Sequence, residues 1–185
     1  MTKLPASQLA VFAALAAFSA VLQLIHIGYQ SPQWGMWLDL VAVSWLIAFF
    51  LFGRKASFYV SLLGALIITL FSPDTWLGAS MKWLATAPMW LILSLYQPTA
   101  YQSLKKLILP LVLALIIRSL IIIPINYYYA IPIWTGMPPS VAVKVIPWYI
   151  IAGFNTLQGI IDVSLAWLIV FKFRLSRYRR LSTKS

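Results

Sequence analysis

The stretch 105–125, KKLILPLVLALIIRSLIIIPI, decides the fold of this chain. After its two opening lysines, Arg118 and Ser119 are the only polar side chains in the stretch. A helix that crosses the hydrocarbon core of a bilayer needs roughly 20 mainly apolar residues, because it rises only about 1.5 Å per residue. We therefore expect these residues to form a membrane-spanning helix.

Similar apolar stretches occur on both sides of this one. Turn-forming or charged residues such as Arg54-Lys55 and Ser72-Pro73-Asp74 separate some of them, and we expect the aromatic segment 126–139 to be irregular. The expected spans are 6–27, 37–53, 56–72, 77–95, 105–125 and 145–171. Because they take up nearly the whole length, the sequence predicts an all-α membrane protein, a bundle of six transmembrane helices in a single domain, residues 1–185.

The composition agrees with a membrane protein. Of the 185 residues, 62% are hydrophobic and only 9% are charged, whereas soluble domains carry about 25% charged residues. A net charge of +11 would suggest a nucleic-acid partner in a soluble protein, but here the charges stand in short clusters between apolar runs. The absence of cysteine excludes a disulfide framework, a thiolate metal site and a CxxC redox site.

The distribution of the cationic residues predicts the orientation. Cytoplasmic loops are enriched in Lys and Arg, and with six spans and a cytoplasmic N-terminus only Lys144 falls outside among the residues that flank the spans. The residues that fall inside are Lys3, Arg54, Lys55, Lys105, Lys106, Lys172, Arg174, Arg177, Arg179, Arg180 and Lys184. We therefore expect a multi-pass protein of the cell membrane with both termini cytoplasmic and a basic tail, residues 172–185, that acts as a stop-transfer anchor.

Aromatic residues gather in the segments expected at the outer face. They are Trp34, Trp37, Trp76, Trp134, Trp148, Tyr127, Tyr128 and Tyr129. Aromatic belts are common where a protein meets the lipid interface, and such a belt accounts for most of them. The polar residues Asn126, Asp39 and Asp74 stand beside them, and aromatic rings with a few convergent polar groups also suit a pocket for a flat organic molecule.

Polar side chains within the expected spans are candidates for function, because they are costly in hydrocarbon. Asn155, Gln158 and Asp162 are three to seven residues apart and share one helix face, which should turn towards the bundle. We expect Asp162 and Arg118 to form a structural ion pair, and Asn155 and Gln158 to contact a ligand, since neutral amides both donate and accept hydrogen bonds. Other residues of interest are Lys82 near the outer end of span 77–95 and the lone His26, which we interpret as interfacial.

The first expected span carries small residues four apart. Three pairs have the spacing that lets another helix approach closely in lipid: Ala10 and Ala14, Ala13 and Ala17, and Ala16 and Ala20. The partner is either a helix of the same bundle or a separate subunit, and the spacing alone does not choose between them.

Several catalytic motifs are absent from the sequence. It has no GxxxxGK[ST] loop for ATP, no HExxH, no GxSxG and no closely spaced pair of carboxylates. Asp39, Asp74 and Lys82 are the candidates for a small enzyme site at the outer face. We expect no enzyme, and we assign no catalytic residue, no metal and no cofactor.

Four stretches resemble a known family. They are LDLVAVSWLIAFFLFGRKASFYVSLLGALI (38–67), TWLGASMKWLATAPMWLI (75–92), NYYYAIPIW (126–134) and IPWYIIAGFNTLQGII (146–161). In their order and spacing they resemble the substrate-binding S components of energy-coupling-factor (ECF) vitamin transporters, and among these the riboflavin-binding branch. The resemblance implies that Asn126, Asn155 and Gln158 hydrogen-bond the flavin ring.

The sequence departs from that branch at two positions. Gln158 stands where the branch has lysine in its FN-x-x-KG motif, and Arg54 follows Gly53 where proline is usual. The loss of a positive charge at position 158 puts the vitamin in doubt more than the family. The full set of expected ligand contacts is Asn126, Asn155, Gln158, Tyr127, Trp76, Lys82 and Asp39.

The resemblance also implies a mechanism and partners. An S component binds its vitamin with high affinity in an outward-facing pocket closed by outer loops. It then docks through small residues of its first helix, here Ala10, Ala13, Ala14 and Ala17, onto a transmembrane scaffold subunit that works with two ABC-type ATPases. Movement driven by ATP topples it so that the pocket opens inward.

Three alternatives to a riboflavin-binding subunit stay open. The first is an S component for another vitamin or precursor, such as a thiamine-related or nicotinamide-like compound. The second is a small membrane enzyme that acts on a lipid or prenyl substrate at the outer leaflet. The third is a structural subunit with no ligand.

Overall fold

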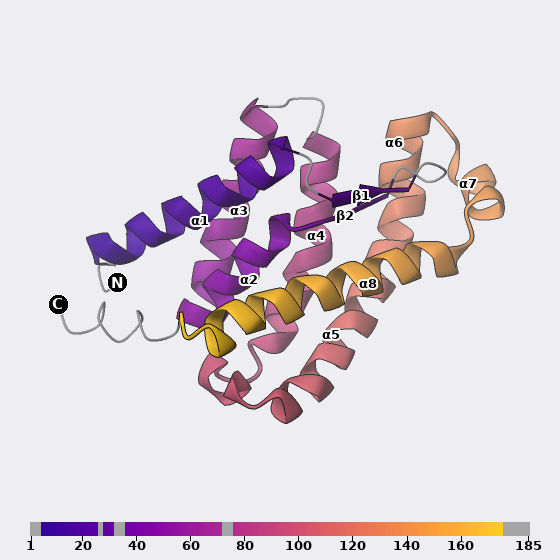
Figure 1. The fold of residues 1–185 in the computed structure, drawn as a ribbon. Helices are drawn as coiled ribbons and strands as arrows, with labels where there is room; N and C mark the ends of the chain where they lie inside the picture. The colour runs from indigo at the N-terminus through magenta and orange to yellow at the C-terminus, as the bar shows by residue number, and fades with distance from the viewer. Residues whose placement is uncertain (1–4, 26–27, 32–35, 72–75, 176–185) are drawn as a thin grey trace.

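The computed structural model describes residues 5–25, 28–31, 36–71 and 76–175, and in these ranges the chain is mainly helical (Figure 1). By length and composition, four helical runs could each cross a membrane: α1 (Ala6–Leu24), α3 (Arg54–Phe71), the run Leu104–Thr135 and the run Trp148–Lys172. The run Leu104–Thr135 begins with α5 (Leu104–Ile125), and the run Trp148–Lys172 begins with α8 (Trp148–Trp167). The protein is therefore a multi-pass membrane protein.

Two further helices lie where the sequence predicts the remaining spans. They are α2 (Val41–Phe52), with 12 residues, and α4 (Trp76–Leu93), which contains Lys82. Since α2 is short and α4 is less apolar than the four long runs, six complete crossings remain a prediction. Residues His26, Asp74 and 176–185 of the expected basic tail lie outside the described residues.

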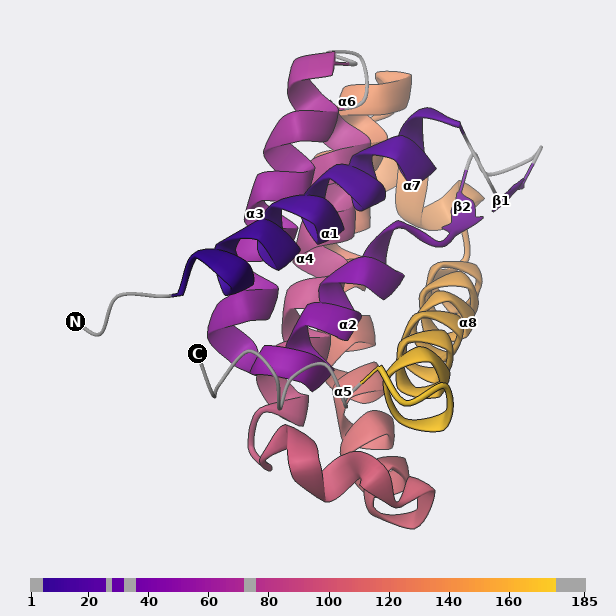
Figure 2. The same ribbon diagram turned by 60° about the vertical axis from the view of Figure 1, so that its left-hand side comes forward.

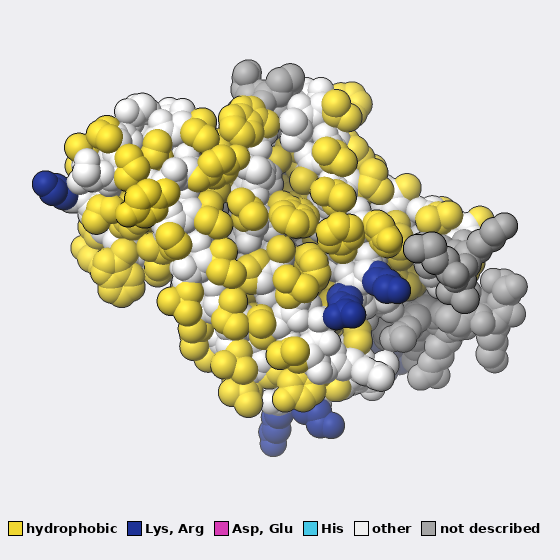
Figure 3. Space-filling view, turned by 180° about the vertical axis from the view of Figure 1, so that it is seen from behind, with side chains coloured by type: hydrophobic (Ala, Val, Ile, Leu, Met, Phe, Trp, Pro, Cys, Tyr) yellow, Lys and Arg dark blue, Asp and Glu magenta, His cyan; other side chains and the backbone are white. Residues whose placement is uncertain are grey.

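Apolar side chains dominate the surface of the molecule. Figure 3 shows them over most of one face, where Lys and Arg side chains form only a few small groups. Exposed leucines and isoleucines continue along α3 and α5. Such extended apolar surface is unusual on soluble monomers and suits lipid.

Helix α2 is the central helix of the bundle. Every residue from Val41 to Leu51 is buried, and α1, α3 and α8 pack around it. A helix that is apolar on all sides is stable only when it is enclosed in this way. The expected span 37–53 therefore contains a short core helix.

The first residues of that expected span form a strand instead. Strand β2 (Trp37–Asp39) pairs antiparallel with β1 (Gly28–Gln30), with Gly28 opposite Asp39. The Asp39 carboxylate accepts a hydrogen bond of 2.9 Å from the N–H of Val41, the first residue of α2. The helix therefore begins at Val41, because Asp39 pairs with a strand and satisfies an otherwise free N–H of the first turn.

A close approach of three helices depends on Gly64 of α3. A Cβ at this position would lie 2.9 Å from Nε1 of Trp45 on α2, and closer still to Oγ of Ser19 on α1. The glycine thus lets α3 pack against α1 and α2 at a distance that no side chain permits.

Helix α5 does not end where the sequence predicts an irregular segment. The chain continues as a π-helical turn, η3 (Asn126–Ala130), and then as α6 (Ile131–Thr135), before Gly136 takes a φ of 71°. The expectation of an irregular segment from residue 126 was therefore wrong as far as Thr135. A π-turn keeps the helix continuous with one extra residue per turn.

The last span begins three residues later than predicted. A short helix, α7 (Pro139–Val145), comes before Pro147, and α8 starts at Trp148. Proline has a fixed φ and no N–H, so it stands readily just before a helix, where the first N–H groups have no partner within the helix. Helix α8 continues in a second π-turn, η4 (Leu168–Lys172).

The bundle has two different ends. At one end, which we call the filled end, the 3₁₀ turn η2 (Pro98–Gln102) inserts the fully buried Tyr101 among aromatic rings of α2, with centroids 6.4 Å from Phe49 and 6.0 Å from Phe50. The other end, the cavity end, carries the β-hairpin, α6 and α7. Figure 2 shows the connection between α4 and α5 at the bottom of the bundle and α6 at its top.

Candidate ligand-binding site

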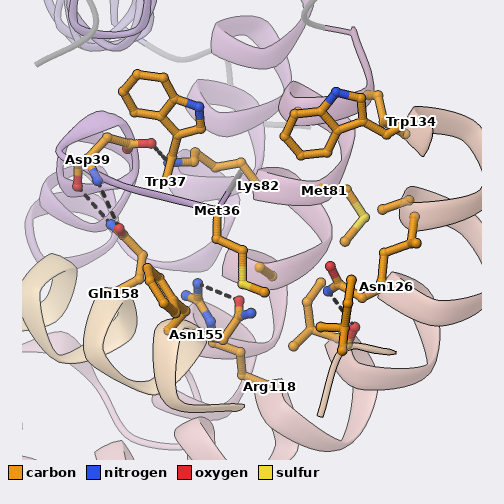
Figure 4. Close-up of a pocket in the computed structure, with 18 of the residues that line it drawn as sticks. Met36, Trp37, Asp39, Met81, Lys82, Arg118, Asn126, Trp134, Asn155 and Gln158 are labelled. Atoms are coloured by element: carbon orange, nitrogen blue, oxygen red, sulfur yellow. Dashed lines mark hydrogen bonds and ion pairs between the residues drawn. The ribbon is translucent and has the colours of Figure 1, made fainter. Parts of the chain in front are cut away.

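A cavity of about 320 Å³ lies at the cavity end. Its wall is built from α1, β2, α4, α5, η3, α6 and α8, so segments from most of the chain meet around it (Figure 4). Sites for small organic molecules are typically a few hundred cubic ångströms and mainly apolar with a few polar groups. The size and the construction of this cavity fit that description.

The wall has an apolar part and a polar part. Trp134, Met81 and Met36 belong to the apolar part, together with Ile122, Ala130, Ile131 and Ile146. Figure 4 shows Trp37 and Trp134 on the opposite side of the view from Arg118 and Asn155. The polar side chains lie on more than one side of the cavity, since Figure 4 shows Lys82 near Trp37 and Asn126 apart from Asn155.

Lys82 and Asp39 form an ion pair at this wall. The pair joins α4 to β2, and its side chains are largely buried. Asp39 also accepts the N–H of Val41, so its carboxylate has partners on both α2 and α4. The third residue of the enzyme alternative, Asp74, lies outside the described residues.

Gln158 fastens α8 to the hairpin. Its Nε2 donates to the Asp39 carbonyl at 2.7 Å and to Oδ1 of Asp162 at 2.7 Å, while its Oε1 accepts the N–H of Asp39 at 2.9 Å. Both amide hydrogens are therefore in use, and only 4% of the residue is exposed. Gln158 lies in the cavity wall as predicted, but its donors are already occupied by the protein.

Arg118 and Asp162 lie together inside the bundle. Nη1 of Arg118 is 4.0 Å from Oδ2 of Asp162, and both side chains are almost fully buried. The structural ion pair predicted from the sequence is therefore present. Arg118 also contributes to the cavity wall, which the sequence analysis did not foresee, and its Nη2 donates to Oδ1 of Asn155 at 3.2 Å.

The two asparagines of the wall use one N–H each on their own helix. Nδ2 of Asn126 donates to the Ile122 carbonyl at 2.8 Å, and Nδ2 of Asn155 donates to the Ile151 carbonyl at 3.0 Å. Among the described residues, Oδ1 of Asn126 and the second N–H of each amide have no partner. Nε and Nη1 of Arg118 are likewise buried without a hydrogen-bond partner in the described part of the chain, so the wall holds unused hydrogen-bonding atoms on Asn126, Asn155 and Arg118.

Two of the predicted contacts lie away from the cavity. Tyr127 is buried, and its hydroxyl donates to the Ile146 carbonyl at 2.6 Å, which ties η3 to the segment before α8. Trp76 is half exposed and packs edge-on against Tyr129 at a centroid distance of 6.4 Å. The structure therefore brings Asn126, Asn155, Gln158, Lys82 and Asp39 to the wall, but not Tyr127 or Trp76.

The sequence analysis missed several wall residues. Met36, Met81 and Gly78 line the cavity, but nothing in their local sequence distinguishes them from ordinary helix or loop positions. Trp37 and Trp134 had a signal, since they belong to the aromatic group expected at this face.

The four alanines of α1 that the resemblance assigns to docking lie on the open face of the helix. Ala10, Ala13, Ala14 and Ala17 are exposed, whereas Ala16 and Ala20 are buried against the bundle. We call the exposed set the α1 alanine face. Packing within the bundle therefore accounts for Ala16 and Ala20, and it does not account for the α1 alanine face.

The fold is that of a helical membrane protein with a cavity at one end, lined by apolar side chains and several polar ones. Comparison with known proteins found no matching family model and no matching curated protein. Among solved structures, the S component of a bacterial ECF transporter is similar, with a TM-score of 0.72, 28% sequence identity and 96% of each chain covered. This likeness supports a substrate-binding transport subunit rather than an enzyme.

Proposed function

We propose that this chain is the S component of an ECF-type importer and that it binds riboflavin in the cavity. The observation that carries the proposal is the pair Asn126 and Asn155, whose amides keep unused hydrogen-bonding atoms in the cavity wall. The similar S component supports the class, and the chemistry of the wall supports the ligand.

The unused atoms suit the polar edge of a flavin. That edge presents two ring carbonyls on either side of one N–H. Asn126 offers an acceptor and a donor, which match an N–H and a neighbouring carbonyl, and Asn155 offers a donor for a second carbonyl. The apolar rings of the flavin would then lie against Trp134 and Met81.

The proposed orientation places the cavity on the outer side of the cell membrane. Arg54 and Lys55 stand between α2 and α3 and Lys105 and Lys106 begin α5, while Lys144 is in α7 at the cavity end. Cationic residues concentrate on the cytoplasmic side of membrane proteins. The filled end therefore faces the cytoplasm, both termini are cytoplasmic, and the chain crosses the bilayer six times.

The α1 alanine face is proposed to dock onto the energising module. Small residues four apart permit a close helix contact in lipid, and among the described elements none covers this face. The partners are a transmembrane scaffold subunit and two ATPases, since the sequence has no ATP-binding loop of its own. Ala13→Trp should leave flavin binding in detergent unchanged and abolish uptake in cells, whereas Leu66→Trp on the lipid-facing side of α3 should leave both intact.

The first experiment tests the ligand directly. The protein is purified in mild detergent without added ligand, its visible absorption is recorded, and riboflavin is titrated by fluorescence quenching. Asn126→Ala and Asn155→Ala should each weaken binding by about 1–3 kcal/mol, roughly 5- to 150-fold, because each leaves a polar group of the bound ring without a hydrogen-bond partner.

The matched control is Thr156→Ala, the neighbour of Asn155 that lines a lipid-facing groove between α5 and α8. It should bind riboflavin as the wild type does. If both asparagine variants fold and bind riboflavin with unchanged affinity, the assignment of these contacts is wrong.

A second candidate is an S component for another vitamin. It is favoured by Gln158, which stands where the riboflavin branch has lysine and whose amide hydrogens are both occupied. A thermal-shift panel with riboflavin, thiamine, nicotinamide and related compounds separates the two candidates. A shift with another vitamin and none with riboflavin would replace the flavin assignment and leave the class intact.

A further inference from the structure

Arg118 is a buried cation that reaches the cavity wall between α5 and α8. Only 3% of the residue is exposed, and its guanidinium lies between Asp162, at 4.0 Å, and the side chain of Asn155, at 3.2 Å. A charge in this position requires a partner, because an isolated ion in a low-dielectric interior is strongly destabilising. Asp162 supplies the opposite charge, and the contact with Asn155 is additional to it.

That contact fixes the orientation of the Asn155 amide. A guanidinium only donates hydrogen bonds and a backbone carbonyl only accepts them. Because Oδ1 of Asn155 accepts from Arg118 and Nδ2 donates to the Ile151 carbonyl, the amide has one possible orientation. The atom left for the cavity is the second hydrogen on Nδ2.

Asn126 differs in this respect. Its amide is tied at one atom, by the bond from Nδ2 to the Ile122 carbonyl, and its Oδ1 has no partner among the described residues. Asn126 can therefore both accept from and donate to a ligand, whereas the fixed amide of Asn155 serves as a donor.

We infer that Arg118 is a positioning residue that, through Asn155, selects ligands presenting a hydrogen-bond acceptor such as a ring carbonyl at this wall. The inference rests on the proposed function in one respect, that the cavity binds a planar heterocycle. A ligand with an N–H at the same point would meet the N–H of Asn155 and leave two donors unpaired. Such a mismatch lowers affinity by about ten- to a hundredfold.

The variant that tests this role removes both charges. Arg118→Met alone would leave Asp162 buried without its counter-charge and could unfold the protein. In the double variant Arg118→Met/Asp162→Asn the site is neutral, and Asn at position 162 still offers an oxygen to Nε2 of Gln158. The matched control is Lys82→Met/Asp39→Asn, which removes the other ion pair of the wall and does not touch Arg118.

The first measurement needs no ligand. In protein labelled with ¹⁵N-asparagine, the side-chain amide signals of Asn155 are identified by their loss in Asn155→Ser. Arg118→Met/Asp162→Asn should shift these signals and leave those of Asn126 in place, and the control double variant should leave the Asn155 signals in place. Unchanged Asn155 signals in Arg118→Met/Asp162→Asn would overturn the inference.

The second measurement compares riboflavin with its 2-thio and 4-thio analogues, in which sulfur, a poor acceptor, replaces one ring carbonyl oxygen. The wild type should bind riboflavin about tenfold more tightly than one of the analogues, and the Arg118→Met/Asp162→Asn variant should lose that preference. An equal loss for all three ligands would show that Arg118 acts only through packing. Failure of the wild type to bind any flavin would refute the riboflavin assignment, while the amide signals would still decide the role of Arg118.

Discussion

The filled end and the cavity end use the same helices in opposite ways. At the filled end, the Tyr101 hydroxyl donates to the Leu93 carbonyl at 2.6 Å and the Trp167 indole donates to the Tyr101 carbonyl at 2.6 Å. At the cavity end, Asn126 and Asn155 keep polar atoms without partners among the described residues.

The difference shows where stability and recognition reside. Buried rings, together with the hydrogen bonds of Tyr101 and Trp167, hold the helices together at one end. Polar atoms without a partner at the other end are costly to bury, and under the proposed function a ligand supplies the missing partners. Substitutions at the two ends should therefore separate unfolding from binding.

The largest effect on stability is expected for Phe50→Ala at the filled end. Phe50 is 2% exposed and packs against Tyr101 and Phe171, whose ring centroids lie 6.0 and 5.5 Å away. Deletion of a buried ring of this kind costs about 3–5 kcal/mol. Thermal unfolding in detergent should show a large decrease in Tm, and a decrease equivalent to less than about 1 kcal/mol would mean that the aromatic cluster does not hold this end together.

A smaller loss of stability is expected for Gly64→Ala, at the point where α3 packs against α1 and α2. The new methyl group would press on Trp45 and Ser19, and overpacking of this kind costs about 1–3 kcal/mol. Gly153→Ala on α8 is the matched control, because a Cβ there meets nothing within 4 Å. A neutral result for Gly64→Ala in the same unfolding assay would show that α1 and α3 can move apart without cost.

Tyr101→Phe tests how much the buried hydroxyl contributes to the stability of the filled end. Loss of the hydroxyl leaves the Leu93 carbonyl without this donor and should cost about 1 kcal/mol at neutral pH. Burial, with a smaller contribution from Tyr96, raises the pKa of Tyr101 from 10.0 to about 12. Because the folded pKa is raised, this contribution to stability is fully present below pH 10 and is lost as the pH rises through about 12.

The measurement is the unfolding free energy of both proteins as a function of pH. The difference between wild type and Tyr101→Phe should shrink above pH 10. A difference that stays constant up to pH 12 would contradict the role of the buried hydroxyl.

The smallest effect on stability is expected for Trp134→Ala at the cavity end. Because 59% of Trp134 is exposed, its removal should change the free energy of unfolding by no more than about 0.5 kcal/mol. Flavin binding should nevertheless weaken about tenfold, since an aromatic contact in the cavity is lost. A variant that loses stability as Phe50→Ala does, but binds normally, would reverse the comparison.

The sequence predicted the long helices because lipid imposes a simple rule on them. A segment that crosses a bilayer must be apolar over its whole length, and α5 and α8 begin within three residues of their predicted positions. The rule does not distinguish a lipid-facing helix from a buried one, so α2 was expected to be longer than it is. The hairpin before α2 was missed because its strands have only three residues each.

Part of the candidate site followed from helix periodicity. Asn155, Gln158 and Asp162 were expected on one inward face, and the structure places the first two at the cavity and the third beside it. The hydrogen-bond partners could not be predicted, because Gln158 pairs with Asp39, 119 residues away in the chain, and Arg118 pairs with Asn155, 37 residues away. Such contacts depend on how the helices pack, and no local pattern encodes them.

The π-turn η3 has a consequence in genetic terms. It places one extra residue between α5 and α6, so loss of a single codon there could convert it to an ordinary α-turn and keep the helix continuous. Because a π-turn fits its extra residue into about the same rotation as an α-turn, the side chains beyond the turn would keep their orientation, and Ile131 and Trp134 would still face the cavity. Deletion of the exposed Tyr128 should therefore yield a folded protein with an unchanged ligand preference, and a deletion that unfolds the chain would show that the π-turn is required for packing.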